Sequence, residues 1–208
     1  MDQSEEKGIV PKQQKGKQTD VSEELKFKSI EEAHLAYREA RRRLLHVSQW
    51  HKYCGAASAE FALCSSEGDP VDREAKESDF FRINIPGPGT VSGDGDDWVQ
   101  IELIEHKVDQ ENNTEFTSMR VRPASNPHNK KQDTAHFFSD SATSTFSVER
   151  KGNTVLAAVH GRNEVPNTKS ESVVDKVRNT LVAVGAMIGL SEPQWKSLVT
   201  GLLRMDAE

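Results

Sequence analysis

The most constraining part of this sequence is a pair of alternating segments separated by a run rich in proline and glycine. Residues Asp79–Ile85 and Trp98–Ile104 both place an apolar side chain at every second position. Such a period of two is typical of a strand with one buried face. The proline and glycine residues of segment 86–97 disfavour both helix and sheet pairing. The stretch therefore predicts two neighbouring strands joined by a loop.

Length and composition indicate one soluble domain preceded by a polar tail. The chain has 208 residues, of which 35% are hydrophobic and 29% charged. We expect residues 1–26 to form a mobile tail, because they contain few apolar side chains to offset the entropy of ordering them. A partner-binding arm is the alternative for this segment. Residues 27–208 are expected to form a single α+β domain.

Charge and hydropathy limit the classes of partner. Residues 54–115 contain 15 acidic and 4 basic side chains, which disfavours binding to a nucleic-acid backbone. No apolar run approaches the roughly 18 residues that a membrane span needs. No basic segment followed by an apolar one opens the sequence, so a cytoplasmic location is expected. The sequence does not indicate an oligomeric state.

The two cysteines, Cys54 and Cys64, lack the spacing of a zinc site or of a disulfide framework. We interpret both as reduced thiols packed in the core. No motif implies a cofactor, and none of the familiar phosphate-binding or nucleophile motifs occurs.

Two regions have the period of amphipathic helices. Ser29 and Glu32 form a capping box, which predicts that a helix begins there. Its apolar stripe, which should face a sheet, consists of Ala33, Tyr37, Ala40, Leu44 and Val47. Arginines 38, 41 and 42 would then lie largely outside. Near the C-terminus, a long helix is expected over residues 173–188 and a short one after Ser191, with an apolar stripe formed by Trp195, Leu198, Val199, Leu202 and Leu203.

The remaining alternating segments predict further strands. Together with the central pair they cover residues 59–64, 79–85, 98–104, 116–122, 135–138, 143–150 and 154–160. A glycine-containing turn at 151–153 predicts a hairpin. Six or seven strands in meander order predict a curved antiparallel sheet. The expected fold class is therefore α+β, with this sheet packed against an N-terminal helix, a long C-terminal helix and a short final helix.

This order of elements, from about Ala59 to Ile188, is loosely similar to the helix-grip fold of START-like and polyketide-cyclase-like ligand carriers. The resemblance implies a curved sheet that wraps a long C-terminal helix around an apolar cavity. It covers architecture without a shared residue motif, so it transfers no site residue and carries no function by itself. It also differs in one respect, because no strand is expected before Ser29.

Candidate ligand-binding residues lie opposite the apolar stripes of the strands or are aromatic. If the sheet curls, some of them would point into a cavity, whereas in a flat sheet they would face solvent. They are Trp50, Tyr53, Arg82, Asn84, Trp98, Gln100, Glu102, Arg120 and His160. No metal site is expected. The weak alternative is a cation held by Asp94, Asp96 and Asp97, which more simply supply turn residues and surface charge.

Three functions remain open at this stage. The first is a domain that binds a small, mostly apolar molecule in a cavity between sheet and helices, without catalysis. The second is a protein-interaction module that uses the loop 86–97 or the arginine-rich helix face around 38–43. The third is a hydrolase-like or cyclase-like enzyme in the same cavity, which would need a titrating group with a strongly shifted pKa in a cleft.

Overall fold

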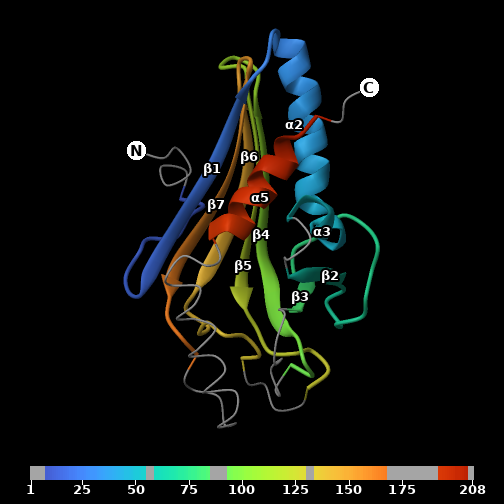
Figure 1. The fold of residues 1–208 in the computed structure, drawn as a ribbon, viewed down its shortest axis with the longest axis vertical. Coiled ribbons are helices and arrows are strands. Elements are labelled where there is room, and N and C mark those ends of the chain that lie inside the picture. The colour runs from blue at the N-terminus through green and yellow to red at the C-terminus, as the bar shows by residue number, and fades with distance from the viewer. Residues whose placement is uncertain (1–7, 55–58, 85–92, 130–133, 168–191, 206–208) are drawn as a thin grey trace.

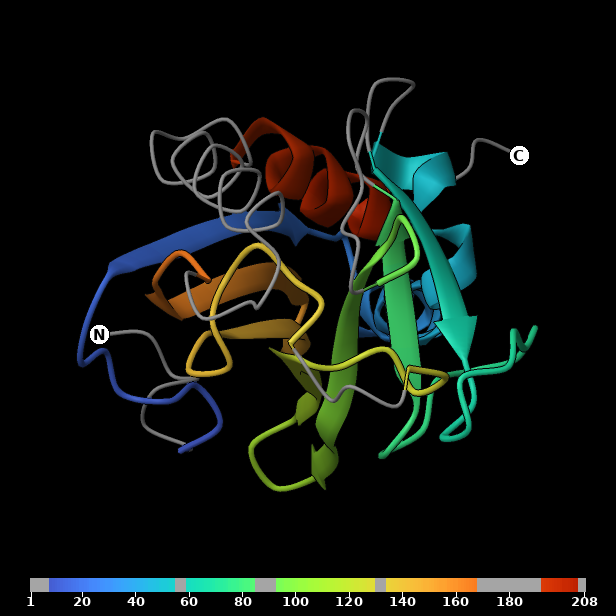
Figure 2. The ribbon, with the colours of Figure 1, turned by 90° about the horizontal axis from the view of Figure 1, so that it is seen from below.

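A computed structural model describes residues 8–54, 59–84, 93–129, 134–167 and 192–205. These residues form one curved antiparallel sheet with helices against one face (Figures 1 and 2). The strands, in chain order, are β1 (Lys17–Lys26), β2 (Glu60–Cys64), β3 (Phe80–Asn84), β4 (Asp97–Asp109), β5 (Thr114–Pro123), β6 (Thr143–Lys151) and β7 (Thr154–Glu164). The helical elements are α2 (Ile30–Leu45), a 3-10 turn (Val47–Gln49), α3 (His51–Cys54) and α5 (Glu192–Leu203).

The order of strands in the sheet is β1-β7-β6-β5-β4-β3-β2. The predicted α+β class with an antiparallel sheet is therefore confirmed, and six predicted strands coincide with β2 to β7. The short final helix is confirmed as α5. The helix predicted over residues 173–188 lies outside the described residues. Among the described helices, none is long and apolar enough to cross a membrane.

The core lies between the helices and one face of the sheet, which we call the inner face. Trp50 occupies its centre, with ring centroids 5.3 Å from Phe61, 5.7 Å from Phe81 and 4.7 Å from Phe146. Trp195 of α5 closes over this group, 5.5 Å from Phe146. Tilted and edge-on ring pairs of this kind stabilise a core beyond the area they bury. The opposite face of the sheet is called the outer face below.

Helix α2 begins where the capping box predicts. The hydroxyl of Ser29 accepts a hydrogen bond from the amide of Glu32, and the Glu32 carboxylate accepts one from the amide of Lys28. The predicted apolar stripe is confirmed as well, since all five of its residues are buried in the core. Local signals for this helix are therefore sufficient, because capping and periodicity act within a few residues.

The expectation that residues 1–26 form a mobile tail without a strand is wrong for residues 17–26, which form β1. This strand pairs along its length with β7, with Val21 opposite Val159. Main-chain hydrogen bonds to β7 hold it, so its polar composition does not prevent ordering. The strand also removes the difference from the helix-grip order, because a strand now precedes the first helix.

The strand predicted over residues 135–138 is also wrong. Its backbone groups bond singly to several neighbours, since the amide of Ala135 donates to Ala124 and its carbonyl accepts from Trp98. Thr134 and Phe138 make only isolated bridges, to Ser125 and Pro166. Ala135 therefore packs in one small cluster, and Phe137 and Phe138 pack in another. The segment is a loop and does not pair as a strand of the sheet. The sequence pattern cannot distinguish these outcomes.

Gly16 and Gly152 offer a matched test of the docking of β1. Both have a positive φ, +69° and +59°, but a Cβ on Gly16 would lie 2.3 Å from the carbonyl oxygen of Glu164, whereas one on Gly152 meets nothing within 4 Å. Both alanine variants incur about 1–2 kcal/mol for the left-handed backbone. We expect Gly16→Ala to lower the free energy of unfolding further, because the clash displaces β1 from β7. Chemical denaturation of both variants checks this, and equal losses would contradict the described packing.

Candidate functional site

Seven of the nine predicted site residues lie on the outer face, away from the helices. They are Arg82, Asn84, Trp98, Gln100, Glu102, Arg120 and His160, and they alternate with side chains of the core. They do not line a space between sheet and helices, because the sheet curves toward its apolar face and the helices cover that face. The sequence pattern grouped residues of one surface, and of its two alternatives, a cavity or solvent, the structure places these residues on the face opposite the helices.

Ion pairs organise this outer face. Glu102 lies in a bulge of β4, and its carboxylate accepts hydrogen bonds from Arg120 at 3.1 Å and from Arg122 at 2.5 Å. At the other edge, His160 Nδ1 and Arg162 Nη1 each lie 2.7 Å from Oδ1 of Asp20. These carboxylates therefore balance part of the positive charge of the face.

Near the start of β4, three predicted residues take structural roles. The side chains of Arg82 and Asn84 both contact the Asp96 carboxylate, at 3.4 and 3.2 Å. Trp98 is buried in a separate small cluster, and its indole N–H donates to the carbonyl of Gly93. These contacts fix the turn that leads into β4.

The alternative metal site is not formed. The carboxylate of Asp94 accepts from Asn126, that of Asp96 from Asn84, and that of Asp97 from the amide of Phe137. The three carboxylates thus serve different partners instead of converging. Within the part of the chain that the structure describes, no group of three histidine, cysteine, aspartate or glutamate side chains is placed to hold a metal ion.

The cysteines and Trp50 belong to the packed interior. Trp50 is fully buried, and its indole N–H is shared between the carbonyls of Arg43 and Leu44. Cys54 and Cys64 are both buried free thiols, as expected. Burial raises the pKa of the Cys54 thiol to about 12. At neutral pH this side chain is a thiol rather than a nucleophilic thiolate.

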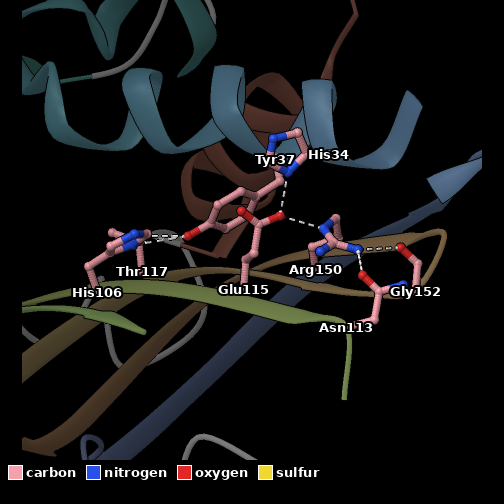
Figure 3. Close-up of polar contacts among 8 residues, drawn as sticks. All are labelled: His34, Tyr37, His106, Asn113, Glu115, Thr117, Arg150 and Gly152. Atoms are coloured by element: carbon pink, nitrogen blue, oxygen red, sulfur yellow. Dashed lines mark hydrogen bonds and ion pairs between the residues drawn. The ribbon is translucent and has the colours of Figure 1, made fainter. Parts of the chain in front are cut away.

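A polar cluster fastens α2 to the ends of β5 and β6 (Figure 3). The Glu115 carboxylate lies 2.7 Å from Nδ1 of His34 on α2 and 2.5 Å from Nε of Arg150 on β6. Arg150 also donates to the side-chain oxygen of Asn113 and the carbonyl of Gly152, and so ties two hairpin turns together. Burial acts to raise the pKa of Glu115, but the hydrogen bonds from Arg150 and His34 outweigh it and lower the pKa.

One turn further along α2, a second group continues this cluster. The Tyr37 hydroxyl lies 2.7 Å from that of Thr117, which in turn lies 2.9 Å from Nδ1 of His106 (Figure 3). Burial raises the pKa of Tyr37, so its phenol stays protonated. Because these groups are directed into the interface between α2 and the sheet, their arrangement serves to position the helix. The polar side chains satisfy one another there.

A groove with a volume of about 510 Å³ lies between β1 and α5. Leu25 of β1, Tyr53 of α3 and Gly201 of α5 give it apolar surface. Its polar groups are Glu23, Lys196, Ser197, Thr200 and Arg204. A neighbouring hollow of about 420 Å³ runs along β1 and α5 and shares Lys196. This groove is the candidate functional site, and Tyr53 is the one predicted site residue that lines it.

The two positively charged side chains of the groove, Lys196 and Arg204, lie in different surroundings. The Lys196 ammonium donates to the carbonyl of Ser22 at 2.8 Å and to the carboxylate of Glu23 at 2.5 Å. Arg204 is exposed at the other end, and its guanidinium adds a second positive charge. An apolar surface with the Lys196–Glu23 ion pair at one end and the exposed guanidinium of Arg204 at the other suits a mostly apolar molecule that carries an acidic or hydrogen-bond-accepting group.

Arg43 holds the wall of this groove in place. Although it belongs to the arginine-rich run around 38–43, it is buried, with 3% of its area exposed. Its guanidinium donates to the carbonyls of Gly201, at 3.0 Å, and of Arg204, and lies 5.3 Å from the centre of the Tyr53 ring. A cation at the last carbonyls of a helix satisfies groups that have no partner within the helix. One side chain therefore joins α2, α3 and α5.

Sequence reasoning missed Lys196, Arg204 and Arg43 as determinants of the site. Arg43 stands in a run of arginines, and no local signal separates the buried member from its exposed neighbours. Lys196 gains its position only when α5 meets β1, 174 residues away in the chain, and Arg204 is placed by the contact of its carbonyl with Arg43 of α2. The one available signal was the polar face of the final helix opposite its apolar stripe.

Comparisons with known proteins add only weak structural likeness. No family model matches the sequence, and neither does any protein of curated function. A hypothetical protein from Helicobacter pylori has a TM-score of 0.47 and 14% identity, over 89% of this chain and 86% of its own. A Mycobacterium smegmatis protein has a TM-score of 0.39 and 14% identity, with coverage of 92% and 93%. Norcoclaurine synthase from Thalictrum flavum has a TM-score of 0.38 and 9% identity, with coverage of 92% and 90%.

The buried pair of Glu115 and Arg150 predicts an acid-sensitive contribution to stability. Because the folded-state pKa of Glu115 is lowered, its stabilisation is present above the ordinary pKa of a glutamate and is lost as the pH falls through the folded value. Glu115→Gln should lower the free energy of unfolding by ~2 kcal/mol at pH 7, with a difference that shrinks toward pH 3. Denaturant titrations across this range measure it, and a pH-independent difference would contradict the assigned ion pair.

Arg43→Lys tests the link between α2 and α5. A lysine cannot donate in a fixed fork to two carbonyls and stack over Tyr53 at once, so we expect a loss of ~1.5–3 kcal/mol in stability. Amide hydrogen exchange in residues 198–204 should accelerate. Arg38→Lys, on the same helix but exposed, is the control and should change neither quantity appreciably. Equal behaviour of the two variants would show that the buried guanidinium does not hold α5.

Proposed function

We propose that this chain binds a small, mostly apolar molecule with an acidic or accepting group, in the groove between β1 and α5, and does not transform it. The observation that carries this proposal is the 510 Å³ hollow, whose apolar surface is flanked by the Lys196–Glu23 ion pair and by Arg204. Ligand sites typically have volumes of about 300–1,000 Å³, apolar walls and a few convergent polar groups. The groove fits this description.

The packing of the interior favours the groove over a central cavity. Aromatic rings of Trp50, Phe61, Phe81 and Phe146 fill the space between the inner face and the helices, with centroid separations of 4.7–6.3 Å. A ligand there would have to displace well-packed side chains, and protein cores are packed as densely as organic crystals. At the groove, by contrast, binding needs no such rearrangement.

The positions of the shifted titrating groups favour binding over catalysis. Glu115 of β5 and Tyr37 of α2, whose pKa values are shifted, lie in the interface between α2 and the sheet, where His34 and Arg150 bond to Glu115 and Thr117 bonds to Tyr37. The Cys54 thiol stays protonated in the core. Catalytic groups typically combine a shifted pKa with a place in a cleft, and these groups do not border the groove.

Occlusion of the groove tests the proposal. The probe is 8-anilinonaphthalene-1-sulfonate, which combines an apolar ring system with an anionic group and fluoresces when it is bound. Thr200 lines the groove from the exposed side of α5, so Thr200→Trp should fill it. We expect the affinity for the probe to fall roughly tenfold or more, equivalent to ~1.4 kcal/mol.

Arg38→Trp serves as the matched control, because it places the same large side chain on an exposed position of α2 outside the groove. It should bind the probe like the unaltered protein. Native mass spectrometry of the purified protein, before and after denaturation, would identify a naturally bound molecule by its mass. Equal probe affinity in Thr200→Trp and Arg38→Trp would contradict the proposed site.

A further inference from the structure

The outer face of β5, β6 and β7 contains polar groups that are buried without a hydrogen-bond partner. Among the residues that the structure describes, the hydroxyls of Ser118, Thr143 and Thr145 are in this state, with residue exposures of 0–2%. Thr145 sits in a row across the sheet, opposite Arg120 on one side and His160 on the other. Buried hydroxyls almost always find a partner, so three such groups on one surface need an explanation.

The segment of residues 8–15, which we call the N-terminal strap, lies across this face. Its Ile9 carbonyl accepts a hydrogen bond from Nη1 of Arg120 on β5 at 3.1 Å. At its other end, Asn163 of β7 accepts from the amides of Gln14 and Lys15, and its own amide donates to Gln13. Because β6 lies between β5 and β7, the strap crosses β6.

Figure 2 shows the N-terminal segment, in blue, on the opposite side of the sheet from α5. Ile9 and Val10 are 1% and 5% exposed, yet neither belongs to the apolar clusters of the core. The strap therefore buries two apolar side chains outside the core clusters, while its Ile9 carbonyl meets the Arg120 guanidinium of the outer face. Apolar side chains cannot accept the hydrogen bonds that this surface offers, which makes the strap an incomplete partner for it.

The contact between Arg120 and Ile9 indicates what a better partner would supply. The Ile9 carbonyl of the strap accepts a hydrogen bond from Nη1 of Arg120, whose Nε donates to Glu102. An oxyanion in the same position would form a stronger, charge-assisted hydrogen bond. The remaining oxygens of the oxyanion could accept hydrogen bonds from the hydroxyls of Thr143 and Thr145 on the adjacent strand β6. The planar guanidinium of arginine is well suited to binding phosphate and similar groups.

We propose that the outer face of β5, β6 and β7 binds a small molecule carrying a tetrahedral oxyanion, a phosphate or sulfate group, and that the strap covers this site when the ligand is not bound. Arg120 binds the oxyanion in place of the Ile9 carbonyl, and Thr145 and Thr143 donate their hydroxyl protons to it. The site is separate from the groove between β1 and α5, so each stands or falls alone.

The test uses the full-length protein with inorganic phosphate and inorganic sulfate as separate probes. Binding is measured by calorimetry, and the position of the strap by amide hydrogen exchange of residues 8–15. Bound phosphate or sulfate should increase exchange in the strap. The probe with the higher affinity identifies which of the two groups the site prefers. No binding of either probe and no change in exchange would overturn the proposal.

Two variants separate the site from its cover. Asn163→Gly keeps the left-handed backbone at this position, where φ is +57°, but removes the side chain that anchors the strap. It should raise the affinity roughly tenfold, because the open form becomes more populated. Thr145→Val keeps the shape of the side chain and removes its unpaired hydroxyl, so it should weaken binding roughly tenfold without lowering thermal stability.

Thr114→Val, near the far end of β5, is the control and should bind like the unaltered protein. The groove variant Thr200→Trp should likewise leave phosphate binding and strap exchange unchanged. If Thr145→Val bound the probe as tightly as Thr114→Val, the hydroxyl row would have no part in binding. That result would overturn the assignment of the site even if the strap moved.

Discussion

The buried guanidinium of Arg43 is the contact on which the helical layer depends. It reaches from α2 to the last carbonyls of α5 and lies over the ring of Tyr53 on α3. A charge in this position is costly unless its donors are satisfied, and here helix carbonyls and Glu39 satisfy them. In the same arrangement, Gly201 of α5 lies close to Tyr53. A glycine is needed there, because a Cβ at position 201 would lie 2.6 Å from the tyrosine side chain. The shape of the groove therefore depends on Arg43, which contacts two of its lining residues, Gly201 and Tyr53, from beneath.

Polar contacts divide the two faces of the sheet into different roles. On the inner face, Glu115, Arg150 and Thr117 fix α2 in register over an otherwise apolar core. On the outer face, ion pairs around Glu102 and Asp20 hold arginines in place, while neighbouring hydroxyls have no hydrogen-bond partner within the described part of the chain. Satisfied polar networks specify a structure, whereas unsatisfied ones mark surfaces whose partner is incomplete. The contrast separates scaffold from candidate site within one sheet.

Local patterns predicted much of the fold and little of the site. The capping box at Ser29 and the alternation of β3 and β4 act over a few residues, so the sequence shows them directly. β1 was missed because it is held by pairing with β7, a strand about 140 residues later. Its polar composition gives no sign of this pairing. The outer-face residues were recognised as a set, but which side the helices cover is settled only by packing. Tyr53 was found as an aromatic residue, whereas Arg43 looked like its exposed neighbours.

The pairing of the first strand with the last has a consequence for how the molecule is made. During synthesis, β1 leaves the ribosome long before β7 exists, so β1 cannot join the sheet until β7 has been made. Contacts between segments so distant in sequence also form slowly. The groove wall, built from β1 and α5, should therefore be among the last of the described parts to form, because it needs segments from both ends of the sheet's connectivity.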